Sequence, residues 1–393
     1  MSALRQVAAV TAMNIRGIPQ RIGASCVIVI GIMGVVGVLV SVFTMTGSFS
    51  ATLLAAGRAD RAIVLRGGAN FEGASNLPGD TVATILNAPG IARTPAGDAA
   101  ASADTLAPVN LARRSNGTLA ALIVRGVSSA TAFAIRPEIK VVEGRLFTPG
   151  LRELIVGRSA QSEFVGLDVD DRIALRDSEW SIVGVYESGD AAESGMLTDS
   201  STLRSAYRGA LVNSVTVVLE STDAFEQFKT ALTTNPALSV DVLREPEYFE
   251  QQSERLAGLF FFITYVVTAI MASGAAFGAL NSMYSAVSAR RVEIATLRAL
   301  GFGAGGVVVS VLIEALLLAL LGALGGTTIA WAMFSGDTIS LGGFQGALIA
   351  ELTVTARTVG VGILWACAVG LLGALVPAIQ AARLPVATAL RAV

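Results

Sequence analysis

The chain has 393 residues, of which 53% are hydrophobic and 15% charged, and its formal net charge is −2. Soluble globular proteins average about 25% charged residues, so this composition excludes an ordinary soluble protein and indicates a membrane protein. The sequence contains no His. This excludes Ser-His-Asp and Cys-His nucleophile pairs and any His-ligated metal site.

Nucleotide binding by a P-loop is also excluded by the sequence. A P-loop needs Gly-Lys-Ser/Thr to hold phosphates, and neither of the two lysines, Lys140 and Lys229, follows a Gly. Asp168, Asp170 and Asp171 follow Gly166-Leu167, where turn formation explains them. We therefore predict no catalytic residue, no metal site and no cofactor of the chain's own. The basic residues flank apolar runs, so no nucleic-acid partner is expected.

The first element is an apolar run preceded by arginines. Residues 1–21 contain Arg5, Arg16 and Arg21 and no acid, and the run from Ile22 to Phe43 has about the length that spans ~30 Å of hydrocarbon. A cleaved signal peptide has an apolar core of only ~7–15 residues. We therefore predict a cytoplasmic segment at 1–21 and an uncleaved first membrane helix with its stalk at 22–60.

Glycine residues recur along this first span. Gly31, Gly34 and Gly37 recur at every third position, which either permits close contact with another helix or reflects an ordinary glycine-rich span. The two cysteines, Cys26 and Cys367, both lie in apolar runs. They are interpreted as small packed hydrophobic residues and predict no disulfide.

Charges return after the first span, and residues 61–245 are predicted to form one folded domain outside the cytoplasm. At its end, Pro246 and Glu247 suit the first turn of a helix. We therefore expect a second stalk and membrane helix at 246–286. Two helices that continue from the bilayer into the domain would carry motion between them.

The domain is predicted to contain two lobes. An α/β lobe is expected from residues 61–90 and 205–245, with strand, helix and strand at 215–219, 222–232 and 240–243. A β-rich lobe is expected from residues 104–200, where alternating runs predict strands at 119–124, 154–156, 172–175 and 180–186. The intervening segment 90–104, rich in Ala, Gly, Pro and Asp, is expected to be a loop.

A short charged segment, residues 287–302, follows the second span. No Asp, Glu, Lys or Arg occurs from Leu256 to Ala289, so the charges that follow must lie at a membrane surface. Three of its four charges belong to Arg290, Arg291 and Arg298. Because short loops rich in Lys and Arg stay in the cytoplasm, this segment is predicted to be cytoplasmic.

The remaining elements follow from the same rule. We expect a third membrane helix at 303–334, a periplasmic loop at 335–357, a fourth membrane helix at 358–382 and a cytoplasmic tail at 383–393. The predicted inside segments contain eight arginines and one acid, Glu293. The predicted fold is thus an α-helical membrane protein with four transmembrane helices and an α/β (mixed α+β) extracytoplasmic domain inserted between helices 1 and 2.

The charged segment permits two interpretations. Arg290 and Glu293 are three residues apart and can pair on one helical face, while Arg291 and Arg298 share a stripe that could meet an acidic partner. It is therefore either a solvated basic loop or a helix that docks on another protein. Apolar surface for docking would come from Val292, Ile294 and Leu297.

Glu314 is the only acid well inside a predicted span. An intramembrane carboxylate is costly and requires a partner, so it marks a candidate site. We interpret it as a structural polar contact, hydrogen-bonded to groups such as Asn281 or Ser282. A proton relay is the alternative, although no second titratable residue lies nearby in sequence.

Several ordered motifs resemble one family of membrane proteins. The run from Asn281 to Gly301 resembles the cytoplasmic signature of type VII ABC transporter permeases, the MacB/FtsX/LolC-LolE group. Glu314-Ala-Leu-Leu-Leu resembles the start of their next span, and the tail from Pro377 to Arg391 is similar to their C-terminal motif. Motifs that look like the MacB periplasmic core domain are Gly126-Val127, Glu143-Gly144-Arg145-Leu146-Phe147 and Ser181-Ile182-Val183-Gly184-Val185.

The resemblance implies a non-catalytic permease subunit of a bacterial inner-membrane transporter. It implies a second permease copy, as homodimer or paralogous heterodimer, and an ABC ATPase that binds ATP. MacB carries its ATPase at the N-terminus, whereas only 21 residues precede the first span here, so a separate ATPase subunit is expected. The residues that would couple to it are Arg290, Arg291, Glu293, Ile294, Leu297 and Arg298.

The mechanism implied is mechanotransmission, in which ATP-driven closure in the cytoplasm moves the stalk and the periplasmic domain to expel material. A periplasmic adaptor, an outer-membrane channel and membrane lipid are the further expected partners, and both termini are expected in the cytoplasm. Two alternatives stay open. One is an FtsX-like subunit that activates an extracytoplasmic hydrolase, and the other is a LolC/LolE-like lipoprotein-releasing permease, which would need hydrophobic surface on the domain.

Overall fold

The structure is a computed structural model that describes residues 11–13, 22–129, 131–209, 211–299, 303–343 and 346–383. The chain divides into two compact units. The helical unit contains the described parts of Met1–Thr46, Gly258–Asp337 and Leu352–Val393, and the inserted domain contains those of Gly47–Ala257 and Thr338–Glu351. The expected cytoplasmic segments 1–21 and 383–393 lie almost wholly outside the described residues.

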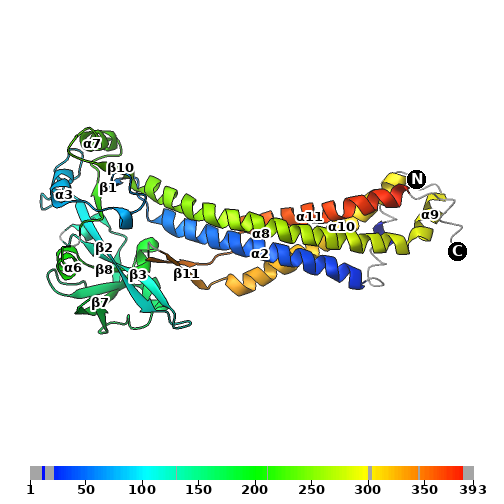
Figure 1. Cartoon of the computed structure of the whole chain (residues 1–393), viewed down its shortest axis with the longest axis horizontal. Coiled ribbons are helices and arrows are strands. Elements are labelled where there is room, and N and C mark those ends of the chain that lie inside the picture. Colours follow the sequence, from blue (N-terminus) through cyan, green and yellow to red (C-terminus); the bar gives the residue numbers. More distant parts are fainter. Residues whose placement is uncertain are drawn as a thin grey trace. The chain divides into compact units, whose positions relative to one another are not determined.

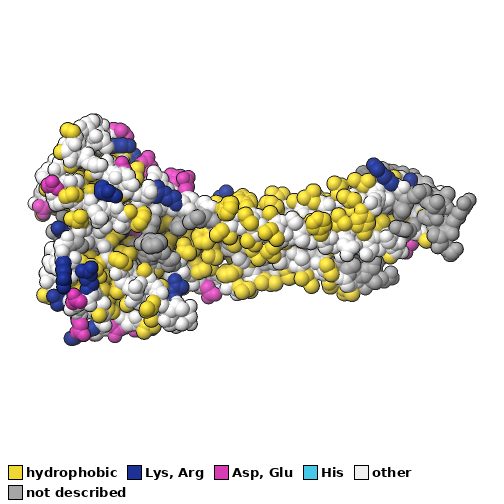
Figure 2. Space-filling view, in the orientation of Figure 1, with side chains coloured by type: hydrophobic (Ala, Val, Ile, Leu, Met, Phe, Trp, Pro, Cys, Tyr) yellow, Lys and Arg dark blue, Asp and Glu magenta, His cyan; other side chains and the backbone are white. Residues whose placement is uncertain are grey.

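Four helices within the described ranges are long and apolar enough to cross a membrane. They are α2 (Ile22–Ala55), α8 (Glu245–Ala289), α10 (Ala304–Phe334) and α11 (Ala356–Arg383). Hydrophobic side chains gather over these helices in Figure 2. The α/β domain lies in sequence between α2 and α8 (Figure 1), which confirms the predicted fold class.

The helical unit has an apolar core in which small residues allow close contact. A Cβ atom added to Gly326 of α10 would lie 2.9 Å from the backbone nitrogen of Gly37 in α2, closer than real Cβ contacts allow. A Cβ atom added to Gly31 would instead lie 3.7 Å from the Cβ of Ala275 in α8, and one added to Gly34 would lie 3.8 Å from the Cε of Met271. Both are ordinary van der Waals distances. The close-packing interpretation therefore holds for Gly37, where α2 meets α10.

One sheet runs through the inserted domain (Figure 1). Its strands are β1 (Arg61–Arg66), β2 (Ala101–Ala112), β3 (Leu119–Val127), β4 (Lys140–Gly144), β5 (Glu153–Gly157), β6 (Arg172–Leu175), β7 (Ser178–Glu187), β8 (Met196–Asp199), β9 (Ser214–Val218) and β10 (Val240–Arg244). Their order is β10-β1-β9-β2-β3-β8-β5-β7-β4, and β6 pairs with β7 outside this path. The pairs β3–β8 and β5–β7 are parallel, and the other pairs are antiparallel.

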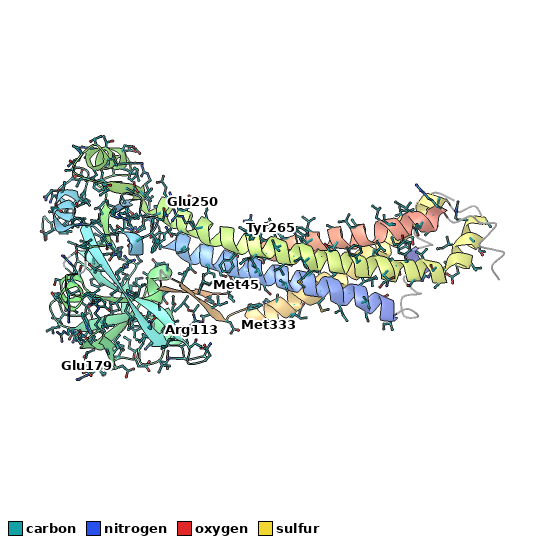
Figure 3. All side chains as sticks on the ribbon, in the orientation of Figure 1. Met45, Arg113, Glu179, Glu250, Tyr265 and Met333 are labelled. Atoms are coloured by element: carbon teal, nitrogen blue, oxygen red, sulfur yellow. The ribbon has the colours of Figure 1, made fainter. Side chains whose placement is uncertain are left out.

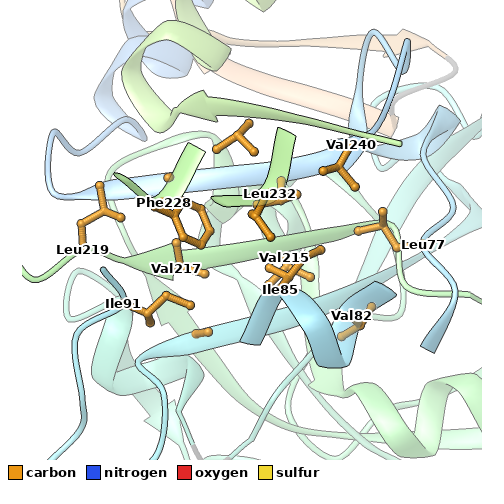
Figure 4. Packing of buried hydrophobic residues seen from close by; sticks show 14 of the residues in the cluster. Leu77, Val82, Ile85, Ile91, Val215, Val217, Leu219, Phe228, Leu232 and Val240 are labelled. Atoms are coloured by element: carbon orange, nitrogen blue, oxygen red, sulfur yellow. The ribbon is translucent and has the colours of Figure 1, made fainter. Parts of the chain in front are cut away.

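The α/β lobe consists of β1, β9 and β10 with α3 (Gly79–Leu86) and α7 (Ala224–Thr233). Helix α7 buries Phe225, Phe228 and Leu232, which recur every three to four residues and so share one helical face. Figure 4 shows Phe228 and Leu232 packed with residues of β9 and α3. The predicted strand, helix and strand of this lobe are confirmed as β9, α7 and β10.

The β-rich lobe contains β3 to β8. The predicted strands at 119–124, 154–156, 172–175 and 180–186 are confirmed as β3, β5, β6 and β7. Its core includes Trp180, Phe164, Leu122 and Ile182, all fully buried. The short helices and turns of the domain are η2 (Glu72–Ala74), α4 (Ala132–Ile135), α5 (Arg158–Glu163), η3 (Ala191–Ser194) and α6 (Ser200–Ala206).

Strand β2 belongs to both lobes. Its residues Ala101–Asp104 pair with β9, whereas Thr105–Ala112 pair with β3. The expected loop at 90–104 was therefore wrong for its last four residues. The sequence Ala-Ser-Ala-Asp has low strand propensity, and pairing with β9 overrides it. The two lobes consequently share one sheet.

The connector between α10 and α11, expected as a loop, is a β-hairpin. Its strands β11 (Thr338–Gly343) and β12 (Gly346–Glu351) are antiparallel, with Ser340 opposite Ile349. The residues between the strands lie outside those described. The expectation of a loop overlooked the alternation Thr338-Ile339-Ser340-Leu341, which is typical of a strand.

Two glycines face each other where β4 pairs with β7. Gly144, within the Glu143 to Phe147 motif, has φ of 71°, and a Cβ on it would lie 2.8 Å from the Cα of Gly184. A side chain at either position would collide with the opposite backbone. After this turn, Phe147 is buried and packs against Phe133, with ring centroids 5.7 Å apart.

Candidate functional site

The charged segment predicted to meet a partner contains a short helix, α9 (Arg291–Ala299). Helix α8 ends just before it, and the backbone nitrogen of Arg290 donates to the Val287 carbonyl at 3.2 Å. Glu293 lies in the first turn of α9 and Arg298 in the last. Both placements suit the helix dipole, because acids are favoured at the N-terminus and cations at the C-terminus.

Arg290 lies between two carboxylates. Its Nε is 4.0 Å from Glu293 Oε2, and its Nη1 is 4.0 Å from Glu314 Oε2 in α10. The predicted pairing of Arg290 with Glu293 is present. The side chains of Arg290 and Glu314 are 14% and 6% exposed, whereas that of Glu293 is 61% exposed. The buried contact therefore joins the charged segment to the third apolar helix.

Apolar packing anchors the same segment. Ile294 of α9 is 8% exposed and clusters with Val307 of α10 and Ala381 of α11. The apolar side of α9 thus packs on two helices of the helical unit, while Val292 and Glu293 are exposed. This arrangement agrees better with a firmly seated helix than with a free loop.

The other predicted residues have different environments. Arg298 is half-buried and engaged in an interaction, and Asn281 is exposed. The side chains of Arg291 and Leu297 lie outside those that the structure describes. For Glu314 a partner such as Asn281 or Ser282 was expected, and the structure places Arg290 Nη1 4.0 Å from its carboxylate. Arg290 and Glu314 lie on different elements, so their pairing depends on how α9 folds back toward α10 and has no local sequence signal.

A second charged cluster lies where the stalk helices meet the inserted domain. Arg61 opens β1 and is 2% exposed, and its Nε lies 2.6 Å from Oε2 of Glu245, the first residue of α8. Its Nη1 lies 2.6 Å from Glu138 Oε1 and donates to the Ile135 carbonyl at 3.1 Å. Its Nη2 donates to the carbonyl of Ala56, next to the end of α2, at 3.2 Å. One guanidinium thus joins both stalk helices to the β-rich lobe.

A third cluster joins the two lobes beside β2. Arg125 of β3 donates through both terminal nitrogens to the Glu72 carboxylate, each at 2.8 Å, and also to Asp104 at 2.9 Å. Burial by itself raises the pKa of Glu72, but the charge and hydrogen bonds of Arg125 outweigh it and lower that pKa to about 2. Asp104 also accepts from Arg136 at 2.8 Å.

These two clusters are not predicted by any local sequence pattern. The sequence offers a weak signal for Arg61, since it directly precedes the apolar run Ala62-Ile63-Val64-Leu65. Its partners lie 77 and 184 residues away, so their identity depends on the tertiary fold. Among the described residues, no group of three or more His, Cys, Asp or Glu side chains is placed to hold a metal ion.

Comparison with family models covers most of the chain. Residues 24–235 match the MacB-like periplasmic core domain, and residues 265–386 match the FtsX-like permease C-terminal region. The chain belongs to the MacB/FtsX-like permeases. It is therefore a type VII ABC transporter permease subunit and a multi-pass membrane protein. Permeases of this family work with an ABC ATPase.

Two solved structures are similar to part of this MacB/FtsX-like permease. One is the periplasmic region of MacB from Actinobacillus actinomycetemcomitans, with 14% identity and a TM-score of 0.37, covering 50% of this chain and 92% of that one. Another is the extracellular domain of the noncanonic ABC-type transporter YknZ from Gram-positive bacteria, with 14% identity and a TM-score of 0.35, covering 47% of this chain and 99% of that one. Comparison with curated proteins gives no significant match.

Proposed function

We propose that this permease is a non-catalytic subunit of a bacterial inner-membrane exporter and couples ATP hydrolysis by a separate ATPase subunit to movement of its inserted domain. The observation that carries the proposal is the seating of α9. Arg290 contacts Glu314 in α10, and Ile294 packs on α10 and α11. A force applied by a partner to α9 would therefore reach the apolar helices instead of being lost in a loose loop.

The stalk helices supply the second part of the coupling. Helix α8 is continuous over 45 residues, about 68 Å at 1.5 Å per residue. This exceeds the ~30 Å hydrocarbon thickness, so α8 is long enough to cross the bilayer and extend beyond it on the side of β10. Helix α2 likewise continues for 34 residues and ends shortly before β1. These continuous helices support mechanotransmission.

The apolar core of the helical unit supports movement of the domain over passage through the helices. Ala, Val, Ile and Leu make up most of the hydrophobic cluster in that core, beside a few buried polar side chains such as Ser310 and Glu314, and such a core offers a polar substrate few contacts. Export of material from the periplasmic side is therefore the function that we favour. A periplasmic adaptor and an outer-membrane channel complete this proposed assembly.

A second permease copy is part of the same proposal. Helix α8 exposes Phe262, Ile270 and Phe277, each by about 70%. Lipid covers such side chains in a monomer, and a second copy would cover part of them in a dimer. We propose that the ATPase docks with Arg290, Arg291, Glu293, Ile294, Leu297 and Arg298 of each copy.

The test is co-purification of the permease with its ATPase. The double variant Arg291→Glu/Arg298→Glu should lose the ATPase and still insert into the membrane, because only the basic stripe is reversed. Arg172→Glu in the inserted domain, where the side chain is 70% exposed, is the matched charge reversal and should retain the ATPase. Retention of the ATPase by the double variant would refute the docking assignment. If the double variant lost the activity of a coupled cell-wall hydrolase while export was unaffected, the FtsX-like alternative would be favoured.

A further inference from the structure

The hairpin formed by β11 and β12 belongs to the inserted domain, although it connects two apolar helices. Strand β12 lies against β3, η3 and α5, and β11 also contacts β3. All three of these elements lie in the β-rich lobe. The chain between α10 and α11 therefore makes its contacts with one lobe of the domain.

Polar contacts fix the hairpin to that lobe. The hydroxyl of Ser194, which is 4% exposed, accepts from the Ile349 nitrogen at 2.9 Å and donates to the Ile349 carbonyl at 3.3 Å. Arg113, labelled in Figure 3, follows β2 and donates to the Ser340 carbonyl at 3.2 Å and to its hydroxyl at 3.1 Å. Both strands are thus tied by hydrogen bonds.

Apolar burial adds to these contacts. Ala347 and Ile349 of β12 are 8% and 3% exposed and belong to the same cluster as Leu122 and Trp180 of the β-rich lobe. A segment that completes the core of a lobe is part of that lobe, because removing it would expose apolar surface to water. The hairpin is therefore a structural element of the lobe.

The other pair of apolar helices, α2 and α8, connects to the α/β lobe. Helix α2 leads into β1 and helix α8 follows β10, and these two strands pair in the α/β lobe. Each lobe is therefore joined covalently to a different helix pair. The lobes meet along β2, where the pairing partner changes from β9 to β3 between Asp104 and Thr105.

We propose that the β11–β12 hairpin is a strap through which α10 and α11 hold the β-rich lobe. Displacement of α2 and α8 relative to α10 and α11 is then opposed by the strap, and the resulting strain falls on β2 near Asp104, where the two lobes meet. The source of that displacement rests on the proposed function. The restraint of the β-rich lobe by the strap requires neither ATP nor a partner, and can be measured on the permease alone.

The test measures the separation of the lobes in the full-length permease in nanodiscs. Spin labels are placed at Asn87→Cys in the α/β lobe and Glu179→Cys in the β-rich lobe, both exposed, with Cys26 and Cys367 replaced by Ala. Figure 3 labels Glu179. Ile349→Asp, which places a charge in the core that the hairpin completes, should at least double the width of the distance distribution. Thr338→Asp, at an exposed position of the same hairpin, should leave it unchanged.

A crosslink tests the strap without disturbing the core. In membranes, Arg113→Cys/Ser340→Cys, at positions whose side chains are hydrogen-bonded to each other, should be joined by a short bis-maleimide, whereas Asn87→Cys/Ser340→Cys should not. Failure of the first pair to crosslink, or an unchanged distribution in a folded Ile349→Asp variant, would overturn the proposal. Arg298→Glu should alter neither result, so failure of ATPase docking is distinguishable from failure of the strap.

Discussion

Arg61 Nε lies 2.6 Å from Glu245 Oε2, and this buried ion pair joins the first residue of β1 to the first residue of α8. Because Arg61 also binds Glu138 and the Ala56 carbonyl, both stalk helices and the β-rich lobe share one cation. A stalk helix that moves must therefore carry the adjoining part of the domain with it.

Removal of this cation should strongly destabilise the inserted domain. Arg61→Leu leaves Glu245 buried and unpaired, and we expect the free energy of unfolding to fall by about 3 kcal/mol or more. Arg58→Leu is the control, since its pair with Asp60 is 43% and 41% exposed, and it should cost less than about 1 kcal/mol. Urea unfolding followed by Trp180 fluorescence, with Trp331 and Trp365 replaced by Phe, measures both. Equal losses would contradict the role of the buried pair.

The pairing of Glu72 with Arg125 predicts a loss of stability in acid. The pKa of Glu72 is about 2 in the folded chain, below its ordinary value near 4.5, so folding favours the ionised form. The resulting stabilisation, on the order of 3 kcal/mol, is fully present above pH ~4.5 and is lost as the pH falls toward 2. Glu72→Gln should be less stable than the wild type at pH 7 and should show a shallower decline between pH 5 and 3.

A matched variant isolates this effect. Glu179→Gln removes a carboxylate that is 75% exposed, and it should retain the wild-type dependence of unfolding free energy on pH. If the free energies of unfolding of Glu72→Gln and the wild type fell in parallel between pH 5 and 3, the pairing with Arg125 would not be what keeps Glu72 ionised.

The opposed glycines in β4 and β7 should tolerate no side chain. In Gly144→Ala the added methyl group meets the backbone of β7, and φ is also positive, so we expect loss of a protease-resistant inserted domain. Gly150→Ala has a similar φ of 82° but open space around it. It should cost only about 1 kcal/mol and remain resistant. Comparable resistance of the two variants would show that β4 does not pair with β7 as described.

Much of the fold follows from sequence patterns. The apolar runs and the arginines around them predict four membrane helices, because length and hydropathy are local properties. Strand β2 and most of the β11–β12 hairpin were not predicted, because their Ala- and Gly-rich strands are stabilised by distant neighbours. Only Thr338 to Leu341 has a local strand signal. Strand β2 depends on β9, and the hairpin depends on Ser194 and Arg113.

The candidate site was only partly predictable for the same reason. Spacing of three residues predicts the Arg290–Glu293 pair, since both lie on one helical face. The contact between Arg290 and Glu314 joins residues on different elements, and no local pattern specifies it. The Arg61 cluster depends on three segments distant in sequence.

The contact between Arg290 and Glu314 predicts mutual compensation. Arg290→Gln should leave the Glu314 carboxylate poorly compensated in its buried site and lower the Tm of the detergent-solubilised permease by about 4 °C or more. Arg290→Gln/Glu314→Gln removes both charges and should recover part of that loss. Thr328→Val is the control, since this exposed residue of α10 bonds only to its own helix at Leu324. A double variant with a Tm no higher than that of Arg290→Gln would contradict the pairing.

The most direct measurement asks on which side of the membrane the charged segment lies, since ATP is available only in the cytoplasm. In a Cys26→Ala/Cys367→Ala background, Glu293→Cys provides a thiol at a position whose side chain is 61% exposed, and Asn87→Cys provides one in the inserted domain. An impermeant maleimide added to cells with a permeabilised outer membrane should label position 87, and should label position 293 only after the inner membrane is opened. Labelling of position 293 while the inner membrane is intact would contradict ATPase docking at α9 and the proposed function with it.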